Sequence, residues 1–156
     1  MPKIDIGSLP MDSGTGYPPP YERVVRGRER KRLGNAAGLE QFGVNLSTLK
    51  PGAAAALRHW HEWADAFIDI LAGELVLIED EGEMLIKPGD AAGFKASTPN
   101  GHHLVNRSEC AAVYREIGRR STHERVEYPD VDLLVVRHNS GMATPAGTAS
   151  RMHEPR

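Results

Sequence analysis

Short apolar runs separated by turn residues follow one another along the chain from Gln41 onwards. In the first run Phe42, Val44 and Leu46 alternate with small or polar residues, a period of two that is typical of a strand with one buried face. Turn signals recur at intervals of about 8 to 12 residues, which indicates an all-β sandwich or barrel. Further strands are predicted over residues 53–63, 67–71, 75–78, 84–87, 102–107, 111–117 and 131–137.

The two ends of the chain differ from this β-rich middle. Residues 1–22 are rich in Gly, Pro and Ser and contain Pro18-Pro19-Pro20, which predicts an extended N-terminal arm. Residues 138–156 offer little to bury and are predicted to be a flexible C-terminal tail. The β-barrel domain is therefore expected over residues 23–137, and the segment around His123 is expected to be a loop.

Composition and charge limit the classes of function. Forty per cent of the 156 residues are hydrophobic and 26% are charged, as in ordinary globular domains. The net charge of −2 predicts no binding to nucleic acid or to an anionic membrane. The longest apolar stretch is interrupted by charged residues, and no secretory signal is visible, so a cytoplasmic location is expected. Cys110 is the single cysteine, which excludes an intrachain disulfide.

Histidines form the candidate chemistry. On an extended strand His59 and His61 point to the same face, and Trp60 points to the opposite one. Two such imidazoles supply half of a site for Zn, Fe, Ni or Cu. His102 and His103 begin a later predicted strand, and because neighbours on a strand point opposite ways, only one of them can join the first pair.

Two stretches resemble the sequence motifs of the cupin superfamily. The first contains Pro51-Gly52, His59-Trp60-His61 and Gly73-Glu74, and the second contains Gly82, Pro88-Gly89-Asp90 and His102 with Asn106. The segments 101–107 and 128–132 are similar to small single-domain cupins often labelled sugar-phosphate-isomerase-like. The resemblance implies a cupin-type jelly-roll β-barrel, a homodimer, and one divalent transition metal (Fe, Mn, Ni or Zn) bound by His59, His61 and His102.

One position departs from the cupin pattern. Ala66 stands where the resemblance expects a metal-binding carboxylate, and Asp65 is its neighbour. Three outcomes stay open: a site of three histidines, a site completed by Asp65 as fourth ligand or general base, or a barrel that has lost its metal. A one-residue offset on a strand points Asp65 to the opposite face, so its participation needs a bend after His61.

Two classes of function follow. The first is a metal-dependent enzyme of isomerase, lyase or dioxygenase type, acting on a small polar molecule. The second is a non-catalytic sensor or binding barrel with a decayed metal site. Lys95, Arg107 and Arg115 are cationic candidates for an anionic substrate group. The basic run from Arg23 to Arg32 fits either an anion site or a solvated or subunit-facing surface.

Overall fold

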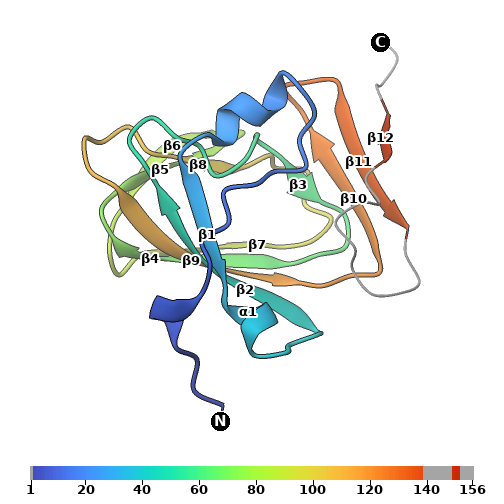
Figure 1. Ribbon diagram of the computed structural model, residues 1–156. Coiled ribbons are helices and arrows are strands. Elements are labelled where there is room, and N and C mark those ends of the chain that lie inside the picture. The colour runs from blue at the N-terminus through green and yellow to red at the C-terminus, as the bar shows by residue number, and fades with distance from the viewer. Residues whose placement is uncertain (1, 139–148, 152–156) are drawn as a thin grey trace.

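The protein is an all-β molecule with short helical turns, described by a computed structural model over residues 2–138 and 149–151 (Figure 1). Its strands are β1 (Arg28–Arg32), β2 (Phe42–Leu49), β3 (Trp60–His61), β4 (Ala66–Ala72), β5 (Leu75–Glu79), β6 (Gly82–Ile86), β7 (Ala91–Phe94), β8 (His103–Val105), β9 (Ala112–Arg119), β10 (His123–Tyr128), β11 (Leu133–His138) and β12 (Ala149–Arg151). The helical elements are the 3-10 turns η1 (Ile6–Ser8) and η2 (Tyr21–Val25) and the one-turn helix α1 (Leu33–Ala36).

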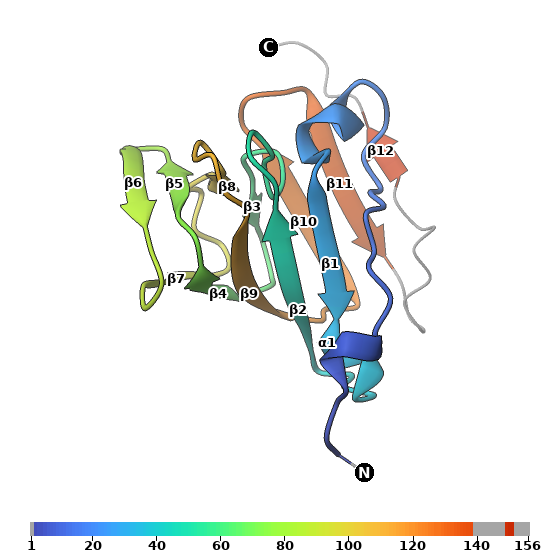
Figure 2. The ribbon, with the colours of Figure 1, turned by 60° about the vertical axis from the view of Figure 1, so that its left-hand side comes forward.

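The strands form three antiparallel sheets. The largest has the order β1-β2-β9-β4-β7, the second β12-β11-β10-β3, and the third β6-β5-β8. Figure 2 shows β10 and β11 on one side of the molecule and the β5–β6 hairpin on the other. These sheets confirm the all-β class predicted from the alternating pattern. Full closure into a barrel stays a prediction, because the described strands make no closed sheet.

The main hydrophobic core lies between the five-stranded and the three-stranded sheet. Strands β4 and β9 each contribute alternate residues to it, β2 contributes Leu49, and β5, β6 and β8 contribute the facing side chains. Its buried members are Leu49, Ala53, Ile68, Ile70, Leu75, Leu77, Ile86, Leu104, Ala112 and Tyr114, with Phe94 packed against them. Burial of these aliphatic side chains provides the main driving force for closing the two sheets on each other.

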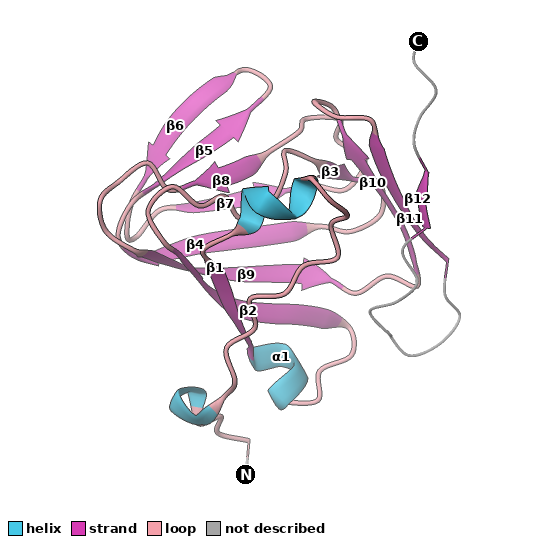
Figure 3. Cartoon of the chain, turned by 45° about the horizontal axis from the view of Figure 1, so that its top comes forward, coloured by secondary structure: helices cyan, strands magenta, loops and turns pink. Residues whose placement is uncertain are grey.

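A second, smaller core joins the N-terminal segment to the four-stranded sheet. Val126, Tyr128 and Leu133 form its buried centre, and Tyr17 and Tyr21 pack against them. Nearer the N-terminus, Asp12 and Arg30 exchange two backbone hydrogen bonds of 2.8 Å. The segment around Asp12 therefore runs beside β1 (Figure 3). Residues before β1 therefore belong to the packed structure.

Several predicted elements differ from those observed. The expected strand over residues 53–63 contains only β3, with isolated bridges before it, because successive backbone groups there bond to different neighbours. The expected loop around His123 is wrong: residues 123–128 form β10, whose inward positions are buried. β1 lies within the basic run. It was not predicted because its side chains are all charged, so no alternation of apolar and polar residues marks it as a strand. The predicted flexible tail lies mostly outside the described residues.

The described residues contain no helix long and apolar enough to cross a bilayer.

Gly73 provides a test of the close packing between β4 and β9. Its φ is +72°, and a Cβ there would lie 2.7 Å from the Ala111 carbonyl oxygen and 2.8 Å from the Ala112 Cα. We expect Gly73→Ala to lower the free energy of unfolding by about 3 to 5 kcal/mol, from the left-handed backbone and the clash together. Gly38→Ala is the matched control, because Gly38 has a φ of +69° and open space around it. It should cost only about 1 to 2 kcal/mol in urea denaturation. Equal losses of stability in Gly73→Ala and Gly38→Ala would contradict the predicted clash at Gly73.

Candidate functional site

A backbone bridge brings the candidate histidines together. The His59 N–H donates to the His102 carbonyl oxygen at 3.1 Å, and the His102 N–H donates to the His59 carbonyl oxygen at 2.9 Å. His61 follows on β3, where it pairs with Val126 of β10. The two predicted stretches of sequence therefore meet through main-chain hydrogen bonds, which do not depend on the identity of the side chains.

The three imidazole rings lie close to one another. The centroid of the His59 ring is 5.0 Å from that of His61 and 4.9 Å from that of His102. Two imidazoles that share one ion at about 2.1 Å have centroids about 5 Å apart. Phe94 stacks on His102 with a centroid distance of 3.6 Å and an interplanar angle of 2°, which fixes the plane of that ring. His103 faces elsewhere, and its Nδ1 lies 2.9 Å from the Ala56 carbonyl oxygen.

The Nδ1 atom of each ring is turned towards an acceptor. In His59 it lies 2.6 Å from the Leu57 carbonyl oxygen, and in His102 it lies 3.3 Å from the Asn100 carbonyl oxygen. Because a carbonyl oxygen only accepts, both rings carry their proton on Nδ1 when neutral. The Nε2 atom then keeps a free lone pair. This is the arrangement that a metal-binding histidine requires.

His61 faces a buried carboxylate instead of a carbonyl. Its Nδ1 lies 3.6 Å from Glu124 Oε2 on β10 and makes no hydrogen bond. The other carboxylate oxygen of Glu124 accepts the N–H groups of Trp63 at 3.2 Å and Arg125 at 3.0 Å. Burial raises the pKa of Glu124, but His61 and the two backbone donors outweigh it and hold the pKa below its usual value. Glu124 is therefore a carboxylate ion beside His61.

Burial also keeps the other two imidazoles neutral. It lowers the pKa of His59 to about 3, with further lowering from the neighbouring His61 and His102. It lowers the pKa of His102 to about 4, although the hydrogen bond to Asn100 acts in the opposite direction. Neutral imidazole is the metal-binding form, so neither ring needs to lose a proton before binding an ion at neutral pH.

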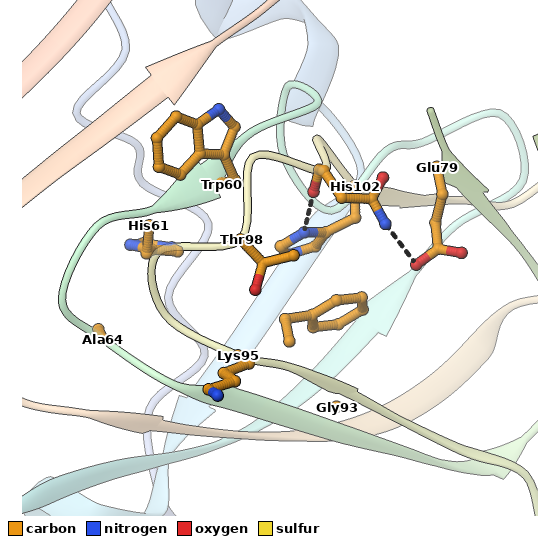
Figure 4. Close-up of a pocket in the computed structure, with 10 residues that line it drawn as sticks. Trp60, His61, Ala64, Glu79, Gly93, Lys95, Thr98 and His102 are labelled. Atoms are coloured by element: carbon orange, nitrogen blue, oxygen red, sulfur yellow. Dashed lines mark hydrogen bonds between the residues drawn. The ribbon is translucent and has the colours of Figure 1, made fainter. Parts of the chain in front are cut away.

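A small pocket of about 170 Å³ opens beside these rings (Figure 4). Its polar side chains are those of His61, Glu79, Lys95, Thr98, Asn100 and His102, and Trp60, Ala64, Gly93 and Phe94 form the rest of its wall. Trp60 also borders the pocket, although it pairs with Glu127 on the outer face of β10 whereas His61 pairs with the inward Val126, as strand alternation predicts. The Asn100 side-chain amide donates to Glu79 Oε1 at 3.3 Å. This volume suits a small polar molecule.

The other charged candidates lie in different places. Lys95 lines the pocket, whereas Arg107 pairs with Glu83 and Arg115 pairs with Asp69 at 2.7 Å, both on exposed surfaces. Of the three predicted cations, Lys95 alone is placed to meet a ligand in the pocket.

Asp65 and Ala66 lie at the start of β4, and the role of Asp65 as a metal ligand stays a prediction. Asp65 is exposed, does not line the pocket, and accepts the Ala96 N–H at 2.7 Å through Oδ1. Ala66 alternates with the buried Ile68 and Ile70 along β4, so its side chain lies on the inner face of the sheet.

The donor chemistry fits a metal, but the side chains do not converge completely. Among the residues that the structure describes, no group of three or more His, Cys, Asp or Glu side chains is arranged tightly enough to hold an ion. His59 neighbours both other rings, and each Nδ1 is already directed to an acceptor.

Arg58 ties together the loops around the histidines. Its guanidinium donates two hydrogen bonds of 2.8 Å to Asp130, a further one to Asp80, and one of 3.1 Å to the Gly101 carbonyl oxygen. Those acceptors lie after β10, after β5 and directly before His102. The Arg58 side chain is only 16% exposed, whereas Asp80 and Asp130 are 44% and 60% exposed, so the network lies at the surface and restrains the loop positions through several bonds to one guanidinium.

Sequence reasoning missed Glu124 and Glu79. Both lie on strands where alternation could have identified them: Glu124 shares its inward face with Val126 and Tyr128. A carboxylate in a row of buried apolar residues is unusual, and that is the signal which the sequence offered.

Comparison with known proteins places this geometry in context. A family model described as a cupin domain matches residues 45–117. A crystal structure of a sugar phosphate isomerase from a cupin superfamily, from Silicibacter pomeroyi, is 41% identical, covers 97% of this chain and 92% of its own, and has a TM-score of 0.91. A putative sugar phosphate isomerase from Acidithiobacillus ferrooxidans is 29% identical over 73% of this chain and 72% of its own, with a TM-score of 0.69. The polyketide cyclase RemF from Streptomyces resistomycificus shares the fold at 18% identity, covering 92% and 87% of the two chains with a TM-score of 0.65. No functionally curated protein matches the chain by sequence.

The lowered pKa values predict that metal-free protein loses stability in acid. Below pH 6.5 the unfolded chain protonates His59 and His102, whereas the folded chain does so only near pH 3 and 4. The unfolded state therefore binds more protons between those values, and each histidine should remove about 2 kcal/mol of stability by pH 4.5. Urea denaturation from pH 7.5 to 4.5 measures the slope.

His102→Asn should flatten that slope, because it removes one of the two buried groups whose pKa is lowered. The same slope in the wild type and in His102→Asn would contradict the assignment.

Proposed function

The chain belongs to the cupin superfamily, and from this premise we propose that it is a metal-dependent enzyme acting on a small polar molecule, most specifically an isomerase of a sugar phosphate. His59, His61 and His102 would hold one divalent transition metal through Nε2. One observation carries the proposal: His59 and His102 direct Nδ1 to carbonyl oxygens, which leaves the Nε2 lone pairs of two adjacent rings for an ion, and His61 lies beside His59 with a carboxylate near its Nδ1.

The substrate class follows from the pocket and from the relative. Lys95 can bind an oxyanion such as phosphate, and Asn100 and Thr98 can hydrogen-bond hydroxyl groups. The relative at 41% identity is described as a sugar phosphate isomerase, which favours isomerase chemistry over lyase or dioxygenase chemistry. A volume of about 170 Å³ fits a short carbon chain better than a nucleotide.

Different residues of the chain would have separate roles in isomerisation. A divalent metal held by His59, His61 and His102 would act as a Lewis acid towards a carbonyl oxygen of the substrate. Glu79 is the carboxylate among the pocket-lining residues, and it can take a proton from one carbon and return it to the next. Phe94 and Trp60 exclude water from one side of the pocket, and Glu124 holds the orientation of His61.

A non-catalytic sensor or binding protein is the second candidate. The observation that favours it is the incomplete convergence of the ligands, together with Ala66 on the inner face where the family pattern has a carboxylate. In that case the same pocket would bind a small molecule without a metal.

Metal content and turnover test the leading proposal. Protein purified without a histidine tag should contain close to one metal per chain by elemental analysis and should interconvert aldose and ketose sugar phosphates in an NMR assay. His61→Ala should lose both properties because it removes one of three ligands. His123→Ala should retain both.

Absence of bound metal, or of turnover, would contradict the proposal. If neither wild type nor His123→Ala holds metal after loading with Fe(II), Mn(II), Ni(II) and Zn(II), the enzyme proposal fails and the binding protein is supported. Metal without isomerase turnover would direct the search to lyase or oxygenase substrates and overturn the isomerase assignment.

Glu124 provides a separate test of the metal site. Glu124→Gln removes the negative charge beside His61 Nδ1, and we expect a 10- to 100-fold weaker metal affinity with little change in fold. Competition with a chelating dye measures the affinity. Glu127→Gln, on the same strand and paired with Arg125, is the matched control and should leave the affinity unchanged. Equal affinities in the two variants would exclude a supporting role for Glu124.

A further inference from the structure

Two arginines of the basic run point into the molecule. In the antiparallel pairing of β1 with β2, Arg28 lies opposite Leu49 and Arg30 lies opposite Ser47. Ser47 in turn lies opposite Tyr114 on β9. Paired residues in an antiparallel sheet share one face, and Leu49, Ser47 and Tyr114 are all buried on the inner face. Arg28 and Arg30 therefore face inward, although β1 is an edge strand (Figure 2).

Neither inward arginine has a carboxylate partner. Arg28 is 6% exposed and donates to two backbone carbonyl oxygens, at 2.5 Å to Ala55 and at 3.2 Å to Gly14. Its Nε is buried without a partner, and so is the Nε of Arg30. Within the described part of the chain, no carboxylate lies within 4.0 Å of either guanidinium. Charged groups this deeply placed are normally paired.

Two buried hydroxyl groups share the inner face with these arginines and lie against each other, those of Ser47 and Tyr114. Ser47 Oγ and Tyr114 Oη are both enclosed, with residue exposures of 0% and 1%, and neither has a partner in hydrogen-bonding geometry. Burial raises the pKa of Tyr114, so its hydroxyl keeps the proton and can donate it to an acceptor. Unpaired buried donors of this kind are rare in folded proteins, and here they gather on one row of the sheet.

The charge of this group is not balanced. Glu116 lies two residues after Tyr114 on β9 and shares its inner face, but it makes no ion pair with either arginine. In the described part of the chain neither guanidinium has a carboxylate in contact, so the positive charge of each lacks a close partner. Water could satisfy the hydroxyl groups but could not compensate that charge, whereas an anion does both.

We propose that Arg28, Arg30, Ser47 and Tyr114 form an oxyanion-binding site inside the fold, which takes a carboxylate or phosphate group. Guanidinium and hydroxyl donors are the groups that recognise such oxygens, and here the Nε atoms of both arginines and the two hydroxyl groups have no acceptor in hydrogen-bonding geometry. Arg30 and Glu116 are half-buried, so the site is open to solvent at their end. This site uses none of the histidines and is independent of the proposed metal chemistry.

Calorimetric titration of the full chain with inorganic phosphate and, separately, with acetate at constant ionic strength tests the site. We expect one anion per chain, and the stronger of the two responses identifies phosphate or carboxylate as the preferred group. Arg30→Gln should weaken binding at least tenfold, and Tyr114→Phe, which removes only a hydroxyl, about fivefold. Arg115→Gln is the matched control, because it removes the same charge from the outer face of the same sheet, and it should leave affinity within twofold.

Three results would overturn the proposal. Wild-type protein that binds neither anion has a water-filled site. Equal weakening by Arg30→Gln and Arg115→Gln indicates attraction by overall charge only. Binding that is lost in His61→Ala or on removal of metal belongs to the histidine pocket. Circular dichroism confirms that each variant is folded, and Tyr114→Phe keeps the test decisive if Arg30→Gln does not fold.

Discussion

The pair of hydrogen bonds between the backbones of His59 and His102 is the contact on which the candidate site depends. It joins a segment that has almost no regular strand to the start of β8, and it sets two imidazoles side by side. Arg58 supports it from outside by holding the Gly101 carbonyl oxygen and two acidic loops. Main-chain pairing thus determines where His59 and His102 lie, and the carbonyl oxygens of Leu57 and Asn100 determine which ring nitrogen of each carries the proton.

The interior of the molecule has two chemically different parts. Strands β4, β5, β6 and β8 close over aliphatic side chains, which supply the driving force for folding. The inner face near β1 and β10 instead carries arginine, glutamate, histidine and hydroxyl groups, several of them buried without partners. Such groups cost stability unless something binds them. A fold that retains them at these positions has an interior suited to polar ligands.

Sequence reasoning predicted the fold class and the histidine pair well, because both depend on local patterns. Alternation at Phe42, Val44 and Leu46 and the spacing of turns indicated an all-β chain, and the resemblance to cupins is confirmed. β1 was missed because arginines occupy its inward positions, so the rule that buried positions are apolar did not apply there. Glu124 was missed for the same reason on β10. Neither the short β3 nor the bridge at His59 follows from propensity, since both are set by partners distant in sequence.

The stacking of Phe94 on His102 connects the aliphatic core to the chemistry of the site. Phe94 packs against the main core on one side and lies parallel to the imidazole at 3.6 Å on the other. The direction of the His102 lone pair is therefore set by how well that core is filled, because a tilt of the phenyl ring tilts the imidazole with it. Substitutions of buried aliphatic residues can consequently reorient the His102 imidazole without changing any residue of the pocket.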